Sequence, residues 1–263
     1  MKITFIGAGN MGGSMAHGLY QTELFQPDDI TCTARSQETL NNCLQKMPGI
    51  HVTTDNAAAV KEADIVVFAV KPWLIEGVIN QVKDAMDYSH QIIISVVAGW
   101  TTERLQEVLK RPGESVPAVF YLIPNTAIDV KESMSFFVPS HATEQQIQLV
   151  QHMMEQVGGC MQIEEKNMPA CMALASCGIA YAYRYIRAAM EGGVEMGLYA
   201  HDAKKIVAHT VMGAAQMILQ HNSHPEQEID CVTTPGGLTI KGLNAMEENG
   251  FTNAVIKGLK AGR

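Results

Sequence analysis

The stretch Lys2-Ile3-Thr4-Phe5-Ile6-Gly7-Ala8-Gly9-Asn10-Met11-Gly12 decides the fold. A short apolar run ends at Ile6 and turns at once into Gly-x-Gly-x-x-Gly, after which the residues from about 11 to 20 favour a helix. Strand, tight turn and helix in this order are the context that a dinucleotide fingerprint requires. Gly7 allows the sharp turn, Gly9 lets the backbone approach a pyrophosphate, and Gly12 lets helix and strand pack closely.

This motif predicts an anion site at the start of the helix, because the free amides of the first turn and the helix dipole both favour negative charge. The alternative is a glycine-rich turn that binds no ligand. The residues that we expect to contact a dinucleotide here are Ile6, Gly7, Ala8, Gly9, Asn10, Met11 and Gly12.

Bulk composition limits the class of protein. The chain has 263 residues, of which 47% are hydrophobic and 17% charged, and this is typical of a globular protein. The formal net charge of −8 argues against nucleic acid or an anionic membrane as the main partner, since both require a basic face. A local pocket can still oppose the global sign, so an anionic substrate remains compatible with this charge.

The cysteines and the amino terminus indicate a reducing compartment. Six cysteines are scattered without a Cys-x-x-Cys pair, which favours reduced thiols in the cytoplasm over a disulfide framework or a zinc site. Met1-Lys2 leads directly into the first expected strand, so we expect no signal peptide.

Further buried strands are expected along the first half of the chain. Residues 30–34 resemble a second strand. Continuous apolar runs, which are typical of parallel strands covered on both faces, occur at residues 64–70, 91–99 and 118–123. A helix over 144–157 and a short strand near 160–163 follow. Because strands alternate with helical stretches, we predict a doubly wound, mostly parallel sheet of the Rossmann type in a dinucleotide-binding domain of residues 1–163.

The end of the second strand bears on cofactor choice. NAD-binding domains place an acidic residue about here to hold the ribose hydroxyls, yet residues 31–37 contain no Asp or Glu. Arg35 and Ser36 could instead hold a 2′-phosphate, which favours NADPH, with NADH as the second candidate. The alternative is a solvated arginine at the start of a helix.

From Lys166 onward the composition of the sequence changes. Residues 167–183 carry no charge and are rich in Ala, Ser, Gly and Met. The length of this uncharged segment is close to the lower limit for a membrane span. Small side chains and the arginines that follow favour a packed helix instead. We expect helix to about Leu198 and again over 202–221, with Asp202 as its cap. This predicts an all-helical second domain, residues 164–263, that also forms a dimer.

A second glycine turn, Thr233-Thr234-Pro235-Gly236-Gly237-Leu238-Thr239, leads into a helix expected over about 238–248. Unpaired amides at such a helix start suit the carboxylate of a small acid, and Thr239 could add a hydroxyl donor. An ordinary junction between loop and helix would look the same. Other candidates are weaker: His221 and His224 lack a third ligand, so we expect a surface loop and no metal.

Taken together, these segments resemble pyrroline-5-carboxylate reductases over most of the chain. Besides the two glycine turns, the resemblance rests on short segments in the expected order, namely Asn56, Ala69-Val70-Lys71-Pro72, Ser95 with Ala98-Gly99, Asn125-Thr126 and Gly193-Val194 with Gly197-Leu198.

The resemblance implies an oxidoreductase that reduces 1-pyrroline-5-carboxylate, a cyclic imine, to L-proline in the last step of proline biosynthesis. It implies that Ala69, Val70, Lys71 and Pro72 border the nicotinamide ribose and Asn56 the adenosine side. Ser95, Asn125 and Thr126 would line the nicotinamide end. Pro235, Gly236, Gly237, Leu238 and Thr239 would hold the substrate carboxylate, with Thr239 near the imine nitrogen. It also implies a homo-oligomer built from an interlocked dimer.

Three positions depart from the family pattern. Ile179 replaces a proline in Ser176-Cys177-Gly178-Ile179-Ala180-Tyr181, Ala127 replaces a proline, and Leu238 replaces a threonine. Backbone amides do not depend on side-chain identity, so the change at Leu238 should spare carboxylate binding.

Hydride transfer to a protonated imine needs alignment more than a strong acid, so orientation, with Thr239 as hydrogen-bond donor, can carry the catalysis. Two alternatives stay open. A β-hydroxyacid dehydrogenase would need a general base, for which Lys166 is the only lysine near the domain junction. A non-catalytic nucleotide sensor could keep the fold without turnover.

Overall fold

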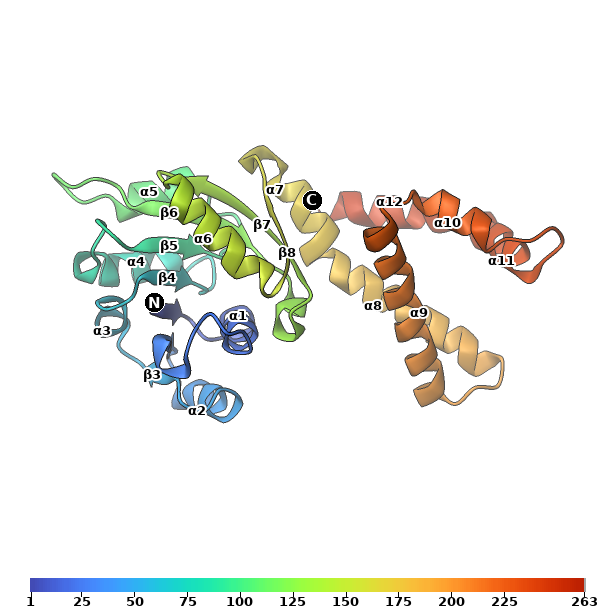
Figure 1. Ribbon diagram of the computed structural model, residues 1–263, viewed down its shortest axis with the longest axis horizontal. Helices are drawn as coiled ribbons and strands as arrows, with labels where there is room; N and C mark the ends of the chain where they lie inside the picture. Colours follow the sequence, from blue (N-terminus) through green and yellow to red (C-terminus); the bar gives the residue numbers. More distant parts are fainter. Residues whose placement is uncertain (263) are drawn as a thin grey trace. The chain divides into compact units, whose positions relative to one another are not determined.

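The computed structural model describes residues 1–262, and the chain divides into two compact units, Met1–Ser176 and a second that begins at Cys177 (Figure 1). The predicted division lies earlier, between residues 163 and 164. The difference has a packing cause, because Met168 is buried in a cluster with Tyr121, Ile123 and Phe136 of the sheet. The segment after residue 163 therefore completes the first unit.

The first unit is built on an eight-stranded sheet within the described residues. Its strands lie in the order β3-β2-β1-β4-β5-β6-β7-β8. Their bounds are β1 Ile3–Ile6, β2 Ile30–Thr33, β3 His51–Thr53, β4 Ile65–Phe68, β5 Ile92–Ser95, β6 Ala118–Ile123, β7 Ser133–Ser140 and β8 Gly158–Gln162.

Strand direction brings the predicted site segments to one edge of this sheet. The strands from β3 to β6 are parallel neighbours, β7 runs antiparallel to β6, and β8 is parallel to β7. The chain moves outward from β1 to β2 and β3, then returns to the other side of β1 as β4. This reversal is the switch point at which open α/β sheets bind ligands, outside the carboxyl ends of the strands.

Helices cover both faces of the sheet (Figure 1). One buried cluster joins α1, α2 and α6 to one face, and a second joins α3, α4 and α5 to the other. The helices of this unit are α1 Asn10–Tyr20, α2 Gln37–Lys46, α3 Asn56–Val60, α4 Ile75–Val82, α5 Thr102–Leu109, α6 Glu144–Glu155 and α7 Met168–Cys171. Short turns of other helix types are η1 Pro27–Asp29, η2 Lys83–Ala85, η3 Thr126–Val130, η4 Glu165–Asn167 and the π-helix η5 Met172–Ser176.

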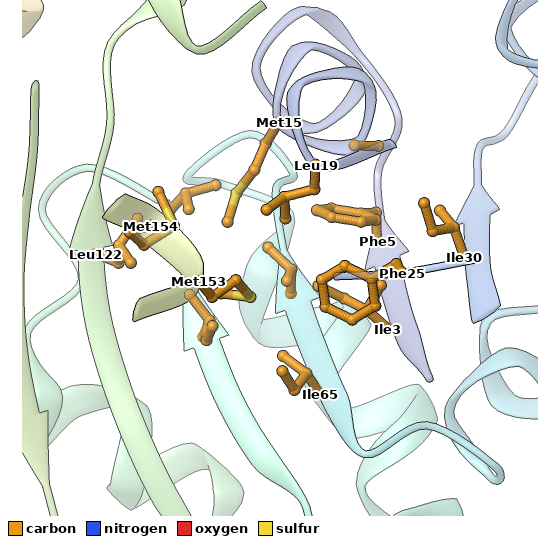
Figure 2. Packing of buried hydrophobic residues seen from close by; sticks show 14 of the residues in the cluster. Ile3, Phe5, Met15, Leu19, Phe25, Ile30, Ile65, Leu122, Met153 and Met154 are labelled. Atoms are coloured by element: carbon orange, nitrogen blue, oxygen red, sulfur yellow. The ribbon is translucent and has the colours of Figure 1, made fainter. Parts of the chain in front are cut away.

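Strand side chains alternate between these two clusters, as the period of a β-strand requires. Phe5 of β1 belongs to the cluster under α1, whereas Ile6 belongs to the opposite one. Figure 2 shows the first cluster, in which Met15 and Leu19 of α1 lie over Phe5. Burying each such side chain contributes about 1.5–3 kcal/mol, so this packing fixes α1 on the sheet. The predicted doubly wound, mostly parallel sheet is confirmed.

The second unit is helical, as predicted. Its helices are α8 Gly178–Glu195, α9 Ala200–His221, α10 Pro225–Cys231, α11 Leu238–Glu248 and α12 Phe251–Ala261. Helices α8 and α9 approach closely at Gly193, where an added Cβ would lie 3.1 Å from the Cβ of Ala203. Of the described residues in α8 to α12, Gly193 and Ala203 alone are buried.

Several predicted boundaries are wrong in detail. The helix expected to run to Leu198 is divided by the π-helix η5 and ends at Glu195. Helix α9 begins at Ala200 with Tyr199 as its N-cap, so Asp202 lies in the first turn and is not the cap. The helix predicted over 144–157 ends at Glu155. Within residues 1–262, no helix has both the length and the apolar character that a membrane crossing needs.

Candidate functional site

The glycine turn between β1 and α1 has the conformation that its sequence predicts. Gly7 has a φ of +97°, which side chains rarely adopt, and a Cβ there would lie 2.9 Å from the carbonyl oxygen of Ala69. A Cβ on Gly12 would lie 2.2 Å from the carbonyl oxygen of Gly7. Both glycines are therefore required by close packing of the turn against itself and against the loop after β4.

Gly9 differs from the other two glycines. A Cβ on Gly9 would meet no atom of the described residues within 4 Å, so packing inside the protein does not require glycine here. Gly9 is the N-cap of α1, and among the described residues no side chain caps that first turn. The helix start thus offers backbone amides and a face without side-chain bulk, and this arrangement fits the pyrophosphate of a dinucleotide.

The other predicted residues of this turn have distinct environments. Ile6 is buried in the cluster under α3, α4 and α5, and Met11 packs against the cluster on the other face of the sheet. Asn10 is exposed as the first residue of α1. The amide of Ala8 donates to the carbonyl oxygen of Thr33 at 2.8 Å. The first turn is therefore tied to the carboxyl end of β2.

A hydrogen bond joins two segments beside this end of β2. The hydroxyl of Thr33 donates to Oδ1 of Asn56 at 2.6 Å, which brings Asn56 next to the glycine turn. Arg35 is exposed. The hydroxyl of Ser36 accepts from the amide of Thr39 at 3.3 Å as the N-cap of α2. Arg35 and Ser36 thus stand at a second helix start at the carboxyl edge of the sheet.

The loop after β4 lies against the glycine turn. The amide of Ala69 donates to the carbonyl oxygen of Ile6 at 2.9 Å, and a Cβ on Gly7 would also lie 2.8 Å from Cγ1 of Val70. Lys71 and Pro72 follow as exposed residues. The predicted segment from Ala69 to Pro72 therefore borders the predicted pyrophosphate loop directly.

Ser95 and Asn125 end the next two strands of the parallel array. Ser95 is fully buried, and its hydroxyl accepts from the amide of Val97 at 3.3 Å, so it shapes the turn after β5. Asn125 is buried as the N-cap of η3, where its Oδ1 accepts from the amide of Ala127 at 3.0 Å. Thr126 beside it is exposed.

The second glycine turn lies in the second unit. Gly237 is the N-cap of α11, and a Cβ there would lie 2.5 Å from Oγ1 of Thr234. Gly236 has a φ of +73°, and Leu238 is 86% exposed. As at Gly9, no side chain among the described residues caps the helix start. The amide of Gly237 donates to the carbonyl oxygen of Thr234 at 2.9 Å, so the amides left for a ligand are those of Gly236 and of the first turn of the helix, which contains Thr239.

The weaker candidates, such as His224 and Lys166, make contacts that stabilise local structure. His224 is the N-cap of α10, and its Nδ1 atom accepts from the amide of Glu226 at 3.2 Å. A helix therefore begins at Pro225, where we expected a surface loop. Lys166 pairs with Glu164 at 2.5 Å on the surface. Among the described residues, no three His, Cys, Asp or Glu side chains group as metal ligands would. All six cysteines are free thiols.

Two residues near the site were not predicted from the sequence. Thr33 holds Asn56, and Trp100 donates a hydrogen bond to the loop after β4. A threonine at the carboxyl end of the strand before Arg35, the arginine predicted to bind a phosphate, is a signal that could have identified Thr33. Trp100 donates to a backbone carbonyl, and because every residue has one, the sequence carries no signal for this contact.

Two family models match the chain. Residues 2–99 match the model described as "NADP oxidoreductase coenzyme F420-dependent", and residues 165–263 match "Pyrroline-5-carboxylate reductase dimerisation". Pyrroline-5-carboxylate reductase 2 of Dictyostelium discoideum is 37% identical over 271 residues, which cover 98% of this chain and 89% of that protein. The chain belongs to the pyrroline-5-carboxylate reductase family.

Other members extend the comparison. Pyrroline-5-carboxylate reductase 1 of the same organism is 38% identical across 98% of this chain, which spans 48% of that relative's length. The crystal structure of a Plasmodium falciparum pyrroline carboxylate reductase with NADP bound matches with a TM-score of 0.87 at 26% identity. That match covers 100% of this chain and 95% of the other.

Proposed function

We propose that this chain catalyses the NAD(P)H-dependent reduction of 1-pyrroline-5-carboxylate to L-proline. The observation that carries the proposal is that this family member keeps two helix starts, at Gly9 and Gly237, without side-chain caps among the described residues. One suits a diphosphate and the other a small carboxylate. The functional division would follow the predicted domains, with residues 1–163 binding the dinucleotide and 164–263 binding the substrate and a second subunit.

The cofactor would be held along the carboxyl edge of the sheet. The turn from Ile6 to Gly12 would bind the pyrophosphate, and Asn56, fixed by Thr33, would border the adenosine side. Ala69 to Pro72 would border the nicotinamide ribose. Ser95 is buried and holds the turn after β5, so its contribution at the nicotinamide end would be to shape the backbone.

Cofactor preference would depend on Arg35. We expect Arg35→Glu to lower the ratio of kcat/KM for NADPH to that for NADH by at least tenfold, because one hydrogen bond to a charged group contributes about 1.5–3 kcal/mol. Steady-state rates with each cofactor measure this ratio. Lys46→Glu, an equal charge change at the other end of α2, serves as control and should leave the ratio within about twofold of wild type. An unchanged ratio in Arg35→Glu would contradict the assignment.

The substrate would be held by the second glycine turn. The amides of Gly236 and Leu238 would bind its carboxylate, whereas the amide of Gly237 donates to the carbonyl oxygen of Thr234 at 2.9 Å and would hold the turn. Thr239 would donate a hydrogen bond at the imine nitrogen. Asn125 and Thr126 would line the nicotinamide end, with the side-chain oxygen of Asn125 holding the turn.

The chemistry requires alignment at one carbon. A bound reduced nicotinamide would supply a hydride to C2 of 1-pyrroline-5-carboxylate, the imine carbon that becomes C5 of proline. The C=N π electrons would pass to nitrogen, which keeps the proton of the protonated imine and becomes the neutral ring amine. The residues of this chain would hold the two reactants in contact and exclude water, which can account for much of a rate enhancement. Among the described residues, Lys166 is paired on the surface, so it lacks the setting of a general base for hydroxyacid chemistry.

The chain would act as a homo-oligomer. The dimerisation model covers residues 165–263, and helices of the second unit expose large apolar side chains such as Met196 at 81% and Leu219 at 81%. A second copy that interlocks with these helices would bury this surface, which is too extensive for an isolated monomer. Free thiols at all six cysteines favour the cytoplasm as the compartment in which it works.

The experiment that tests this function is consumption of NADPH with 1-pyrroline-5-carboxylate as acceptor, followed by nicotinamide absorbance. Parallel reactions supply 3-hydroxy acids with NADP. Turnover of the imine alone supports the proposal. Turnover of a hydroxy acid instead would favour the dehydrogenase alternative, and NADPH binding without any turnover would favour a nucleotide sensor.

A further inference from the structure

A tryptophan from the loop after β5 holds the loop after β4. The Nε1–H of Trp100 donates to the carbonyl oxygen of Pro72 at 3.1 Å, and the Trp100 side chain is only 3% exposed. A buried indole N–H needs an acceptor, so this contact fixes the position of an otherwise exposed turn. Pro72 itself belongs to the segment that would border the nicotinamide ribose.

Trp100 has two further contacts, one at the face of its ring and one through its own backbone amide. The guanidinium carbon of Arg104 lies 3.9 Å from the centre of the Trp100 ring, within the range of a cation–π contact. The amide of Trp100 donates to the carbonyl oxygen of Val97 at 3.3 Å, in a turn that Gly99 permits with a φ of +78°. Trp100 therefore has little freedom to release Pro72.

Tyr121 of β6 also contacts the loop after β5. Its hydroxyl accepts from the amide of Gly99 at 3.1 Å and donates to Sδ of Met172 at 3.9 Å. Burial raises the pKa of Tyr121, which keeps the hydroxyl protonated and able to donate. The carboxyl ends of β4, β5 and β6 are thus joined by Pro72, Trp100, Gly99 and Tyr121 in a continuous series of contacts.

We propose that Trp100 is a positioning residue for hydride transfer, which sets the loop Ala69–Pro72 against the nicotinamide end of the cofactor. The inference rests on the proposed function, which puts this loop beside the nicotinamide ribose. Hydride transfer is sensitive to small displacements of the reacting atoms, so a mobile loop should slow the chemical step itself.

The test is Trp100→Phe, which keeps an aromatic ring and removes the N–H donor. We expect kcat/KM for NADPH to fall about three- to tenfold, as for one lost hydrogen bond. We also expect the primary isotope effect on kcat with NADPH deuterated at C4 to increase, because misalignment makes hydride transfer more rate-limiting. Loss of folded protein would lower the apparent rate without changing this isotope effect.

Tyr88→Phe is a matched control. The buried Tyr88 hydroxyl donates to the carbonyl oxygen of Leu109 at 2.7 Å under the guanidinium of Arg111, 3.7 Å from the ring centre. Like Trp100, Tyr88 therefore donates to a backbone carbonyl and has an arginine over its ring, but it lies away from the predicted site. We expect it to lower Tm without changing kcat/KM or the isotope effect. Equal kinetic losses in both variants, or a Trp100→Phe protein within twofold of wild type, would overturn the inference.

A second variant and a binding measurement keep the test independent of folding and of the reaction. Tyr121→Phe releases Gly99 and should shift the kinetics in the same direction as Trp100→Phe. If the wild-type protein does not reduce the imine, the proposed function fails, yet the loop can still be tested by NADPH binding. Weaker NADPH binding in Trp100→Phe than in Tyr88→Phe would then support the loop assignment, and equal affinities would refute it.

Discussion

Gly9→Ala should fold like the wild-type protein and lose most of its affinity for NADPH. A Cβ at this position meets no described protein atom within 4 Å, so the substitution costs about 1 kcal/mol or less as a change of N-cap. The same methyl group would occupy the side from which a pyrophosphate must approach. Loss of one or more charge-assisted hydrogen bonds predicts a decrease in affinity of roughly 10- to 150-fold.

Gly12→Ala is the contrasting variant. Its Cβ would lie 2.2 Å from the carbonyl oxygen of Gly7 and 2.8 Å from the Cβ of Ala69, so the turn and the loop after β4 must both move. Overpacking of this kind costs about 1–3 kcal/mol. We therefore expect both Tm and NADPH affinity to fall in Gly12→Ala, whereas Gly9→Ala loses affinity alone. Thermal unfolding and NADPH fluorescence titration distinguish the two, and full affinity in Gly9→Ala would refute a pyrophosphate site at this turn.

Thr239→Ala should lower turnover of the imine by about 10- to 100-fold and leave NADPH binding unchanged. The side chain lies in the first turn of α11, next to the amides that would bind the substrate carboxylate. A donor aimed at the nitrogen whose charge changes during the reaction contributes to the transition state, and removing one such donor costs on this scale or more. Steady-state kinetics measure the loss in kcat, and fluorescence titration measures the cofactor affinity.

Thr239→Ser is the control for this variant, because it keeps the hydroxyl and removes only a methyl group. We expect its kcat to stay within a few-fold of wild type. If Thr239→Ala retains full turnover, the threonine has no role in catalysis. If Ser and Ala are equally impaired, the methyl group matters and the hydroxyl does not.

Strands β4, β5 and β6 could be predicted because each is a continuous apolar run. The order of the strands was not predicted, and the short β3, which lacks such a run, was missed. Residues such as Val66 and Ile93 are fully buried between helices, and this double burial produces the uninterrupted hydrophobic pattern. Strand β7 was missed for the opposite reason. It is antiparallel, alternates Ser with larger side chains and contains Pro139, which weakens any strand pattern.

The predicted glycine roles at Gly7 and Gly12 agree with the packing of the turn, because each role follows from backbone geometry that only glycine permits. The contacts of Trp100 and Tyr121 could not be predicted in this way. Each joins a side chain to the backbone of a loop distant in sequence, and backbone acceptors and donors are the same at every residue. The predicted start of the helix at Asp202 was wrong, because α9 begins at Ala200 and an acidic residue in the first turn looks like a cap in sequence.

In the proposed reaction, this chain transfers a hydride from NADPH to the imine carbon of 1-pyrroline-5-carboxylate. The most direct test uses NADPH that carries deuterium at both C4 positions, with the product analysed by mass spectrometry and NMR. We expect L-proline with a single deuterium at C5. Proline without deuterium, or no proline at all while the protein binds NADPH, would contradict it.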